Sequence, residues 1–340
     1  MLAKNWRKIG SNLVRYGRWV APPVISIGLV TWLVWKVTPA RLAEAVATPA
    51  FPWLVAVSVA QLLVLFVWDT VCVWWLFSLP HRRLSFRTVL RARVDTVIWS
   101  AVNLEVGQAA FAWRLARATG DSVQRALGRC LLLALFDAGT LQSLALAGSF
   151  LVHEPLIRWL RWVCVAVVGG LLLLVVVVKL LPERWYRGLA EQDWAHWLTW
   201  WTWRDAVILW ALRLVMFLLV LAYVWAALAI CGIRTGVRTV VGVIPFVLIA
   251  ESLPGTGGLG ERETALMYLL HAGEGRRGVL LCLGLTWSTV IILGRVAIGL
   301  VGWLLPHRDQ DAQEEAPGRT PPGAAAERPG AGLAPGRPRA

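Results

Sequence analysis

Charged side chains are scarce in this chain of 340 residues, at 16%, whereas hydrophobic residues make up 58%. The apolar residues fall into repeated runs close to the twenty residues that an α-helix needs to cross a bilayer. Lysine and arginine, which produce the net charge of +14, occur in short blocks between these runs and form no separate basic domain. Such blocks are typical of membrane topology and of contact with anionic headgroups, so no nucleic acid is expected as a partner. The composition predicts an all-α polytopic integral membrane protein.

The sequence also lacks the residue patterns of metal sites and enzymes. Its five cysteines show no Cys-x-x-Cys spacing and lie within or at the ends of apolar runs, which is typical of small core residues. Its five histidines form no metal-ligand pattern, so we expect no metal and no other cofactor. There is no nucleophile elbow and no P-loop, and the longest internal loop, roughly residues 182–205, is short for a catalytic domain. The chain is therefore not expected to be an enzyme.

Six apolar runs are long enough to cross the membrane completely. They cover residues 19–37, 51–79, 130–152, 159–181, 206–231 and 279–305. A basic segment, 1–18, precedes them, and residues 306–340, rich in proline, glycine and alanine, are expected to form a disordered tail. A cleaved signal peptide ending near Ala47 is the alternative interpretation of the first run, although that run is long for one. The membrane domain is expected to cover residues 19–305.

Two further apolar stretches are interrupted by polar residues and glycine. The first, Val94–Trp113, contains Asn103, Glu105 and Gly107 and has a block of arginines on each side. Because arginine favours the cytoplasmic side, a full crossing here would put one block on the wrong side of the membrane. A re-entrant helical hairpin removes the conflict, since it enters and leaves on the same side. The glycine-rich break at about residues 240–272 is interpreted as a second re-entrant hairpin that enters from the opposite face.

This arrangement keeps most of the basic residues on one side of the membrane. Segments assigned to the cytoplasm hold 23 lysines and arginines, segments assigned to the outside hold 8, and three arginines remain within membrane segments. The bias predicts that both termini are cytoplasmic. The tryptophan-rich segment 184–204 is interpreted as an amphipathic helix in the headgroup layer, which either anchors the protein or collects lipids.

A faint internal duplication relates two halves of the membrane domain, at about residues 19–152 and 159–305. Gly107–Gly120 matches Gly260–Gly273 at an offset of 153 residues, and the same offset carries the second span onto the fifth and the third onto the last. Three spans in each half would turn the second copy upside down, as in the inverted repeats of many transporters. Chance similarity between glycine-containing apolar segments is the alternative.

The glycine-rich segment Glu251–Leu270 is the first candidate for a site. A helix that starts at Gly260 or Glu261 within the membrane presents unpaired N–H groups and the positive end of its dipole. Glycines let a phosphate approach the backbone, and an arginine adds a charge-assisted contact. The residues predicted to bind a lipid headgroup are Gly257, Gly258, Gly260 and Arg262. The alternative is structural: Glu261 and Glu263 complement the helix dipole while the glycines permit tight packing.

Other ionisable residues fall within or beside the predicted membrane segments, where a charge costs roughly 2.5–3.5 kcal/mol at a helix centre. They are Asp69, Glu105, Asp137, Arg213, Glu251 and Arg295. Of these, Glu105, Asp137 and Arg295 are expected to form the polar network of a cavity together with Glu263. A pair of Asp137 with Arg295 on repeat-related spans is one interpretation. Arg213 lies near enough to the expected boundary to extend its side chain to the cytoplasmic surface.

Residues Pro254–Leu266 resemble the signature Pro-x-x-Gly-Gly-Leu-Gly-x-Arg-Glu-x-Ala-Leu of the lysylphosphatidylglycerol synthase transmembrane (flippase-like) family. Asn103–Gly120 resembles the first hairpin of that family more loosely. The resemblance implies a lipid flippase of the bacterial inner membrane. The soluble aminoacyl transferase that is fused to this domain in the family's synthases is not found in this sequence, so synthesis of an aminoacyl lipid is not implied. Of the family's Glu-Arg-x-x-Asp pattern only Asp137 is present, with Leu133 and Ala134 at the first two positions.

Two functions are consistent with these observations. The first is a flippase or translocase that moves a phosphate-bearing lipid: a phospholipid, an aminoacyl-phospholipid or a polyprenyl-phosphate-linked lipid. The second is a non-transporting membrane partner or regulator of an enzyme that makes lipids or envelope polymers, or that modifies glycans. A membrane-embedded enzyme that modifies lipids is a third class, for which the sequence offers no catalytic residue.

Overall fold

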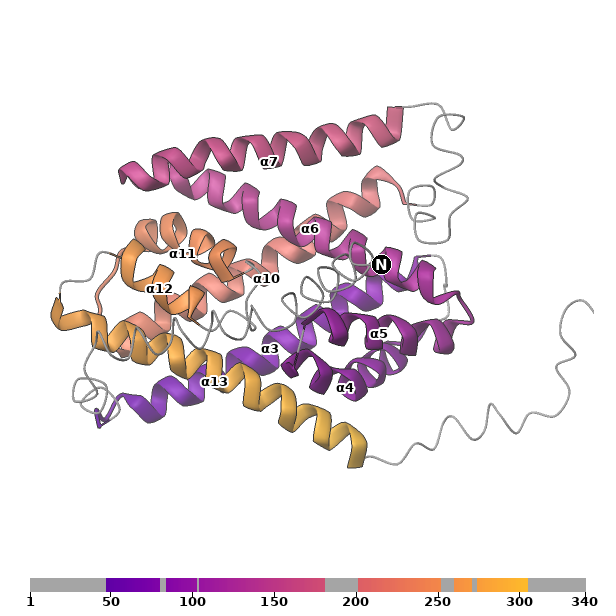
Figure 1. Ribbon diagram of the computed structural model, residues 1–340, viewed down its shortest axis with the longest axis horizontal. Helices are drawn as coiled ribbons and strands as arrows, with labels where there is room; N and C mark the ends of the chain where they lie inside the picture. Colours follow the sequence, from indigo (N-terminus) through magenta and orange to yellow (C-terminus); the bar gives the residue numbers. More distant parts are fainter. Residues whose placement is uncertain are drawn as a thin grey trace, which may run out of the picture. The chain divides into compact units, whose positions relative to one another are not determined.

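The computed structural model describes residues 47–79, 84–102, 104–180, 201–251, 260–270 and 274–304. Within these ranges the chain forms nine α-helices (Figure 1). They are α3 (Phe51–Ser78), α4 (Phe86–Val102), α5 (Leu104–Thr119), α6 (Val123–Ser149), α7 (Pro155–Leu180), α10 (Trp203–Ile230), α11 (Val237–Glu251), α12 (Glu261–Leu269) and α13 (Glu274–Leu304). The helical class predicted from the composition is confirmed.

Five of the described helices are long and apolar enough to cross a membrane, namely α3, α6, α7, α10 and α13. They correspond to five of the six predicted spans. The other span, 19–37, lies outside the described residues, as do the basic segment 1–18, most of the tryptophan-rich segment and the tail 306–340. On α7, side chains such as Trp162 and Leu173 are largely exposed, as expected of a surface that faces lipid. The chain is therefore a multi-pass membrane protein.

The remaining four described helices pack as two pairs. Helix α4 lies against α5, and α11 lies against α12 (Figure 1). These helices have 17, 16, 15 and 9 residues, which is shorter than the roughly twenty that cross a bilayer. They occupy the two stretches that the sequence distinguishes from full spans, about 94–113 and 240–272.

Helix α4 begins at Phe86, eight residues before the stretch predicted from apolar residues alone. The last charge of the added turns, on Arg93, has partners within the protein. Arg93 forms an ion pair with Asp69 on α3, and its guanidinium lies 5.5 Å from the centre of the Phe111 ring on α5. A prediction based on apolar runs ends the segment at an arginine. An arginine that is paired inside the protein can instead be part of the helix.

Side-chain caps decide where two of the spanning helices begin. The Ser122 hydroxyl accepts the Arg125 N–H at 3.2 Å and starts α6. Thr202 and Asp205 form a reciprocal capping box at the start of α10. Both helices consequently start earlier than the apolar runs 130–152 and 206–231 predict.

Buried apolar side chains form two cores along the same spanning helices. The first includes Phe77, Leu115 and Leu132, and the second includes Val224 and Ile244. On three helices a single charged residue lies between the segments that contribute to each core. These residues are Asp69 on α3, Asp137 on α6 and Arg213 on α10. A charged layer therefore separates the two apolar cores.

Glycines bring the backbones of α6 and α11 into direct contact. A Cβ atom at Gly148 would lie 2.2 Å from the Val241 carbonyl oxygen, and one at Gly242 would lie 2.3 Å from a methyl group of Val152. Small residues allow this close approach between helices in a membrane, where apolar burial from water no longer drives association.

Replacing Gly148 with valine tests this packing. The added side chain would meet the backbone of α11, so we expect a loss of roughly 1–3 kcal/mol of stability and a lower Tm in detergent. Gly169→Val on α7 is the matched control, because a Cβ at Gly169 has no neighbour within 4 Å. Equal Tm values for the two variants would contradict a close α6–α11 contact.

Candidate functional site

The charged layer between the cores is built around Arg213, which is 1% exposed. Its Nη1 donates to Asp69 Oδ1 at 2.6 Å, and its Nε lies 3.1 Å from Asp137 Oδ1, within ion-pair distance but not aligned for a hydrogen bond. Asp69 also pairs with Arg93. Two arginines and two aspartates from α3, α4, α6 and α10 thus balance in charge, and we call them the four-charge layer.

The four-charge layer corrects two interpretations drawn from the sequence. Asp137 pairs with Arg213 and not with Arg295, because α10 packs against α6 at this level while Arg295 lies on α13 near the end of α4. Arg213 does not extend to the membrane surface. Its guanidinium lies between the carboxylates of Asp69 and Asp137, and these charged groups bind it more strongly than the membrane surface would.

A second polar cluster lies where α11, α12 and α13 meet, and Arg262 is at its centre. Both oxygens of the Glu251 carboxylate accept from its guanidinium, with Nε 3.0 Å from Oε2 and a short contact from Nη2 to Oε1. The Arg262 guanidinium also lies 4.1 Å from the centre of the Trp287 ring, and its Nη1 is 3.4 Å from Ser288 Oγ. With 1% exposure, Arg262 is enclosed and its charge is matched by Glu251.

Glu263 holds the start of α12 in place. Its Oε2 accepts the Gly260 N–H at 2.6 Å, and its Oε1 accepts the Ser288 hydroxyl at 2.8 Å. Gly260 has φ +93°, a conformation that side chains with a Cβ rarely adopt. The predicted helix start at Gly260 or Glu261 is confirmed. Gly257 and Gly258, which were predicted to bind phosphate with it, lie outside the described residues.

Aromatic residues continue this cluster towards α3 and α10. The rings of Tyr223 and Trp287 lie 5.1 Å apart, and the Tyr223 hydroxyl is 2.8 Å from Ser58 Oγ. None of these three residues was predicted as part of a site, because serine and aromatic residues are common in apolar helices and have no distinguishing spacing. Glu251 was named among the ionisable residues, but its pair with Arg262 was not predicted.

The other predicted members of the polar network lie apart from these clusters. Arg295 Nη1 donates to the Ser100 carbonyl oxygen at 3.3 Å, at the end of α4. Glu105 is an exposed residue in the first turn of α5. The structure therefore divides the predicted network: Glu263 belongs to the cluster around Arg262, Asp137 to the four-charge layer, and Arg295 to the end of α4.

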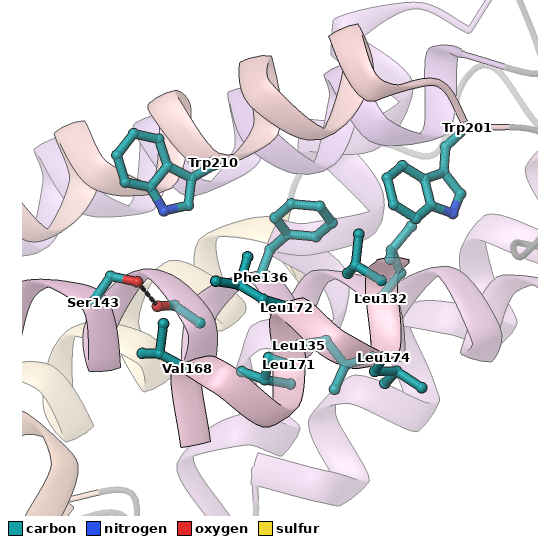
Figure 2. Close-up of a pocket in the computed structure, with 12 residues that line it drawn as sticks. Leu132, Leu135, Phe136, Ser143, Val168, Leu171, Leu172, Leu174, Trp201 and Trp210 are labelled. Atoms are coloured by element: carbon teal, nitrogen blue, oxygen red, sulfur yellow. Dashed lines mark hydrogen bonds between the residues drawn. The ribbon is translucent and has the colours of Figure 1, made fainter. Parts of the chain in front are cut away.

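An apolar cavity of about 150 Å³ lies beside the four-charge layer, between α6, α7 and the start of α10. Figure 2 shows Trp201 and Trp210 on either side of Phe136. Leucines and valines of α6 and α7 form most of the remaining wall. Phe136 directly precedes Asp137, so the cavity and the charged layer share one turn of α6.

In comparisons with known proteins, no protein-family model, no curated protein and no solved structure matches this chain.

Removing the central arginine tests the four-charge layer. Arg213→Leu leaves the Asp137 carboxylate without its ion-pair partner, while Asp69 keeps Arg93, so we expect a loss of roughly 3–5 kcal/mol. The double variant Arg213→Leu with Asp137→Leu should recover part of this loss. Thermal and SDS-induced unfolding of the purified protein measure both effects. Arg158→Leu, at an exposed position on α7, is the control; a loss for Arg213→Leu no larger than the control's would contradict the proposed pairing.

Proposed function

We propose that this protein is a lipid flippase or translocase that moves a phosphate-bearing lipid across the bacterial inner membrane. The observation that carries the proposal is the meeting of two short helical pairs with one spanning helix. The α11–α12 pair brings Arg262 to Ser288 of α13, and the end of α4 brings its carbonyl oxygen to Arg295 of α13. Polar groups placed along the middle of a spanning helix are what a path for a headgroup requires.

An inverted repeat is part of the proposal, and the helix boundaries support it. Shifted by 153 residues, the bounds of α3, α4, α5 and α6 coincide with those of α10, α11, α12 and α13 to within four residues at each end. The contacts between α3 and α10 support opposite directions for equivalent helices. Trp68 donates to the Leu212 carbonyl at 2.9 Å, while Ser58, earlier on α3, reaches Tyr223, later on α10.

The two helical pairs would then be re-entrant hairpins that enter from opposite faces. Three spanning helices, α3, α6 and α7, separate the start of α3 from the start of α10, which reverses the direction of the second copy. In this topology both termini and the arginine blocks around the first hairpin are cytoplasmic, and the loop before α11 is outside.

A lipid substrate agrees with the apolar surroundings of the charged residues. The cavity next to Asp137 is lined by aliphatic and aromatic side chains, which suits acyl chains. The resemblance of Pro254–Leu266 to the flippase-like transmembrane family points in the same direction. Neither feature distinguishes a phospholipid, an aminoacyl-phospholipid and a polyprenyl-phosphate-linked lipid.

One observation favours the alternative of a non-transporting membrane partner for a lipid- or glycan-modifying enzyme. The charge of Arg262, the residue predicted to bind phosphate, is already matched by Glu251 inside the protein. A structural role for this pair would suit a protein that binds a partner and moves no lipid. Neither function includes a catalytic step by this chain.

The glycine at the start of α12 offers a direct test of the flippase function. In proteoliposomes, we expect the wild-type protein to move headgroup-labelled phosphatidylglycerol or a polyprenyl phosphate between leaflets faster than protein-free vesicles do. Gly260→Ala should abolish this movement, because an alanine at φ +93° displaces the helix start that carries Arg262 and Glu263.

Gly232→Ala is the matched control for this experiment. Gly232 also has a positive φ, of +73°, but lies at the end of α10, so its replacement carries a similar backbone strain without changing α12. Equal rates for the two variants would remove α12 from the transport path. If correctly folded wild-type protein moved none of the lipids, the partner function would replace the flippase.

A further inference from the structure

Arg295 differs from Arg93, Arg213 and Arg262 in having no carboxylate of the described residues within ion-pair distance. Arg93, Arg213 and Arg262 each lie within 4 Å of an aspartate or glutamate. Arg295 donates one hydrogen bond of 3.3 Å to the Ser100 carbonyl and forms no ion pair with any residue that the structure describes. A guanidinium has five N–H donors, so most of the Arg295 donors have no acceptor among the residues that the structure describes.

The position of Arg295 is set by tight contacts on both sides of it. A Cβ at Gly294 would lie 2.0 Å from a methyl group of Leu62 on α3, and one at Gly299 would lie 2.7 Å from Cβ of Ile98 on α4. Helix α13 is therefore held against α3 and α4 at this level. A long side chain on a helix fixed in this way presents its charge in a defined place.

Arg295 also lies between the two matched polar clusters. It is seven residues from Ser288, which corresponds to roughly 10 Å along α13. On its other side, the Ser100 carbonyl to which it donates belongs to α4, seven residues after Arg93 of the four-charge layer. The Glu251–Arg262 pair and the four-charge layer are each balanced in charge, and Arg295 adds a positive charge between them.

Arg295 is more exposed than Arg262, the arginine that the sequence predicts to bind phosphate. Arg262 is 1% exposed, so an anion reaches it only after Glu251 moves away. Arg295 is only partly buried, and a ligand can contact it without breaking an ion pair. Because an unmatched charge in a membrane is expensive, an anion that supplies the missing counter-charge is bound favourably there.

We propose that Arg295 is the residue that binds the phosphate of a lipid headgroup. This inference rests on the proposed function and moves the headgroup contact from Arg262 to the junction of α13 with the end of α4. Phosphate is the expected chemistry because a planar guanidinium donates two parallel hydrogen bonds to its oxygens. Glu251 and Arg262 then form the neighbouring matched pair that the headgroup passes.

Protection from an arginine-specific reagent tests the proposal on the wild-type chain. The protein in maltoside detergent is treated with phenylglyoxal, and modified arginines are located by peptide mass spectrometry. Arg295 should be modified, Arg262 should not, and phosphatidylglycerol should protect Arg295 several-fold, whereas a glucosyl diacylglycerol without phosphate should not. If inorganic phosphate protected Arg295 and phosphatidylglycerol did not, the site would bind a free anion, and the proposal of a lipid ligand would be wrong. No protection by either phosphate would overturn the site.

Variants of Arg295 provide the second arm. Arg295→Gln should weaken phosphatidylglycerol binding roughly tenfold to a hundredfold, since charge-assisted hydrogen bonds are lost, and Arg295→Lys should retain part of the affinity. Arg158→Gln, at an exposed position, should bind as the wild type does. Unchanged affinity in correctly folded Arg295→Gln would overturn the proposal.

Binding and movement together separate this inference from the function on which it rests. If Arg295→Gln moved lipid at the wild-type rate, the phosphate site would be wrong and the flippase would stand. If the wild type bound phosphatidylglycerol through Arg295 but moved none, the site would stand and the flippase function would fail.

Discussion

The rest of the structure depends on the pairing of Arg213 with Asp69 and Asp137. A guanidinium that is almost fully enclosed among membrane helices is tolerated only when carboxylates surround it. These three residues come from α10, α3 and α6, so their pairing fixes the relative height of three spanning helices. Arg93 then draws α4 to the same level through Asp69.

Charge matching also explains how a sequence of mostly apolar helices can specify one arrangement. Leucine and valine side chains pack in many ways, whereas an ion pair in a low-dielectric interior has few alternatives. The four-charge layer lies between the two apolar cores, and Glu251 with Arg262 fixes the second helical pair against α13. Arg295 is the exception to this matching, because it forms no ion pair with a residue that the structure describes.

Much of the architecture could be predicted from the sequence because it depends on length and spacing. The apolar runs located five spanning helices, and the glycines with their flanking arginines located the two helical pairs. The helix start at Gly260 followed from glycine chemistry and the acidic residues after it. The capped starts of α6 and α10 were missed because serine, threonine and aspartate lie outside the apolar runs.

Partner choice among charged residues could not be predicted in the same way. Which face of a uniformly apolar helix turns inward depends on packing, so the sequence did not show that Asp137 faces Arg213 and that Arg295 faces α4. The burial of Arg262 was missed for a related reason. Its partner, Glu251, is eleven residues away in the sequence, on the other side of a glycine-rich segment, and the local pattern does not show that the two residues meet.

The opposite orientation of the two halves is the central claim, and labelling of single cysteines tests it most directly. In a chain without its five native cysteines, Ser85→Cys lies before α4 and Gly236→Cys lies before α11, both at exposed positions. A membrane-impermeant maleimide added to right-side-out vesicles should label Gly236→Cys and spare Ser85→Cys, and inverted vesicles should show the reverse. Labelling of both positions from the same side would contradict an inverted repeat and the transport path built on it.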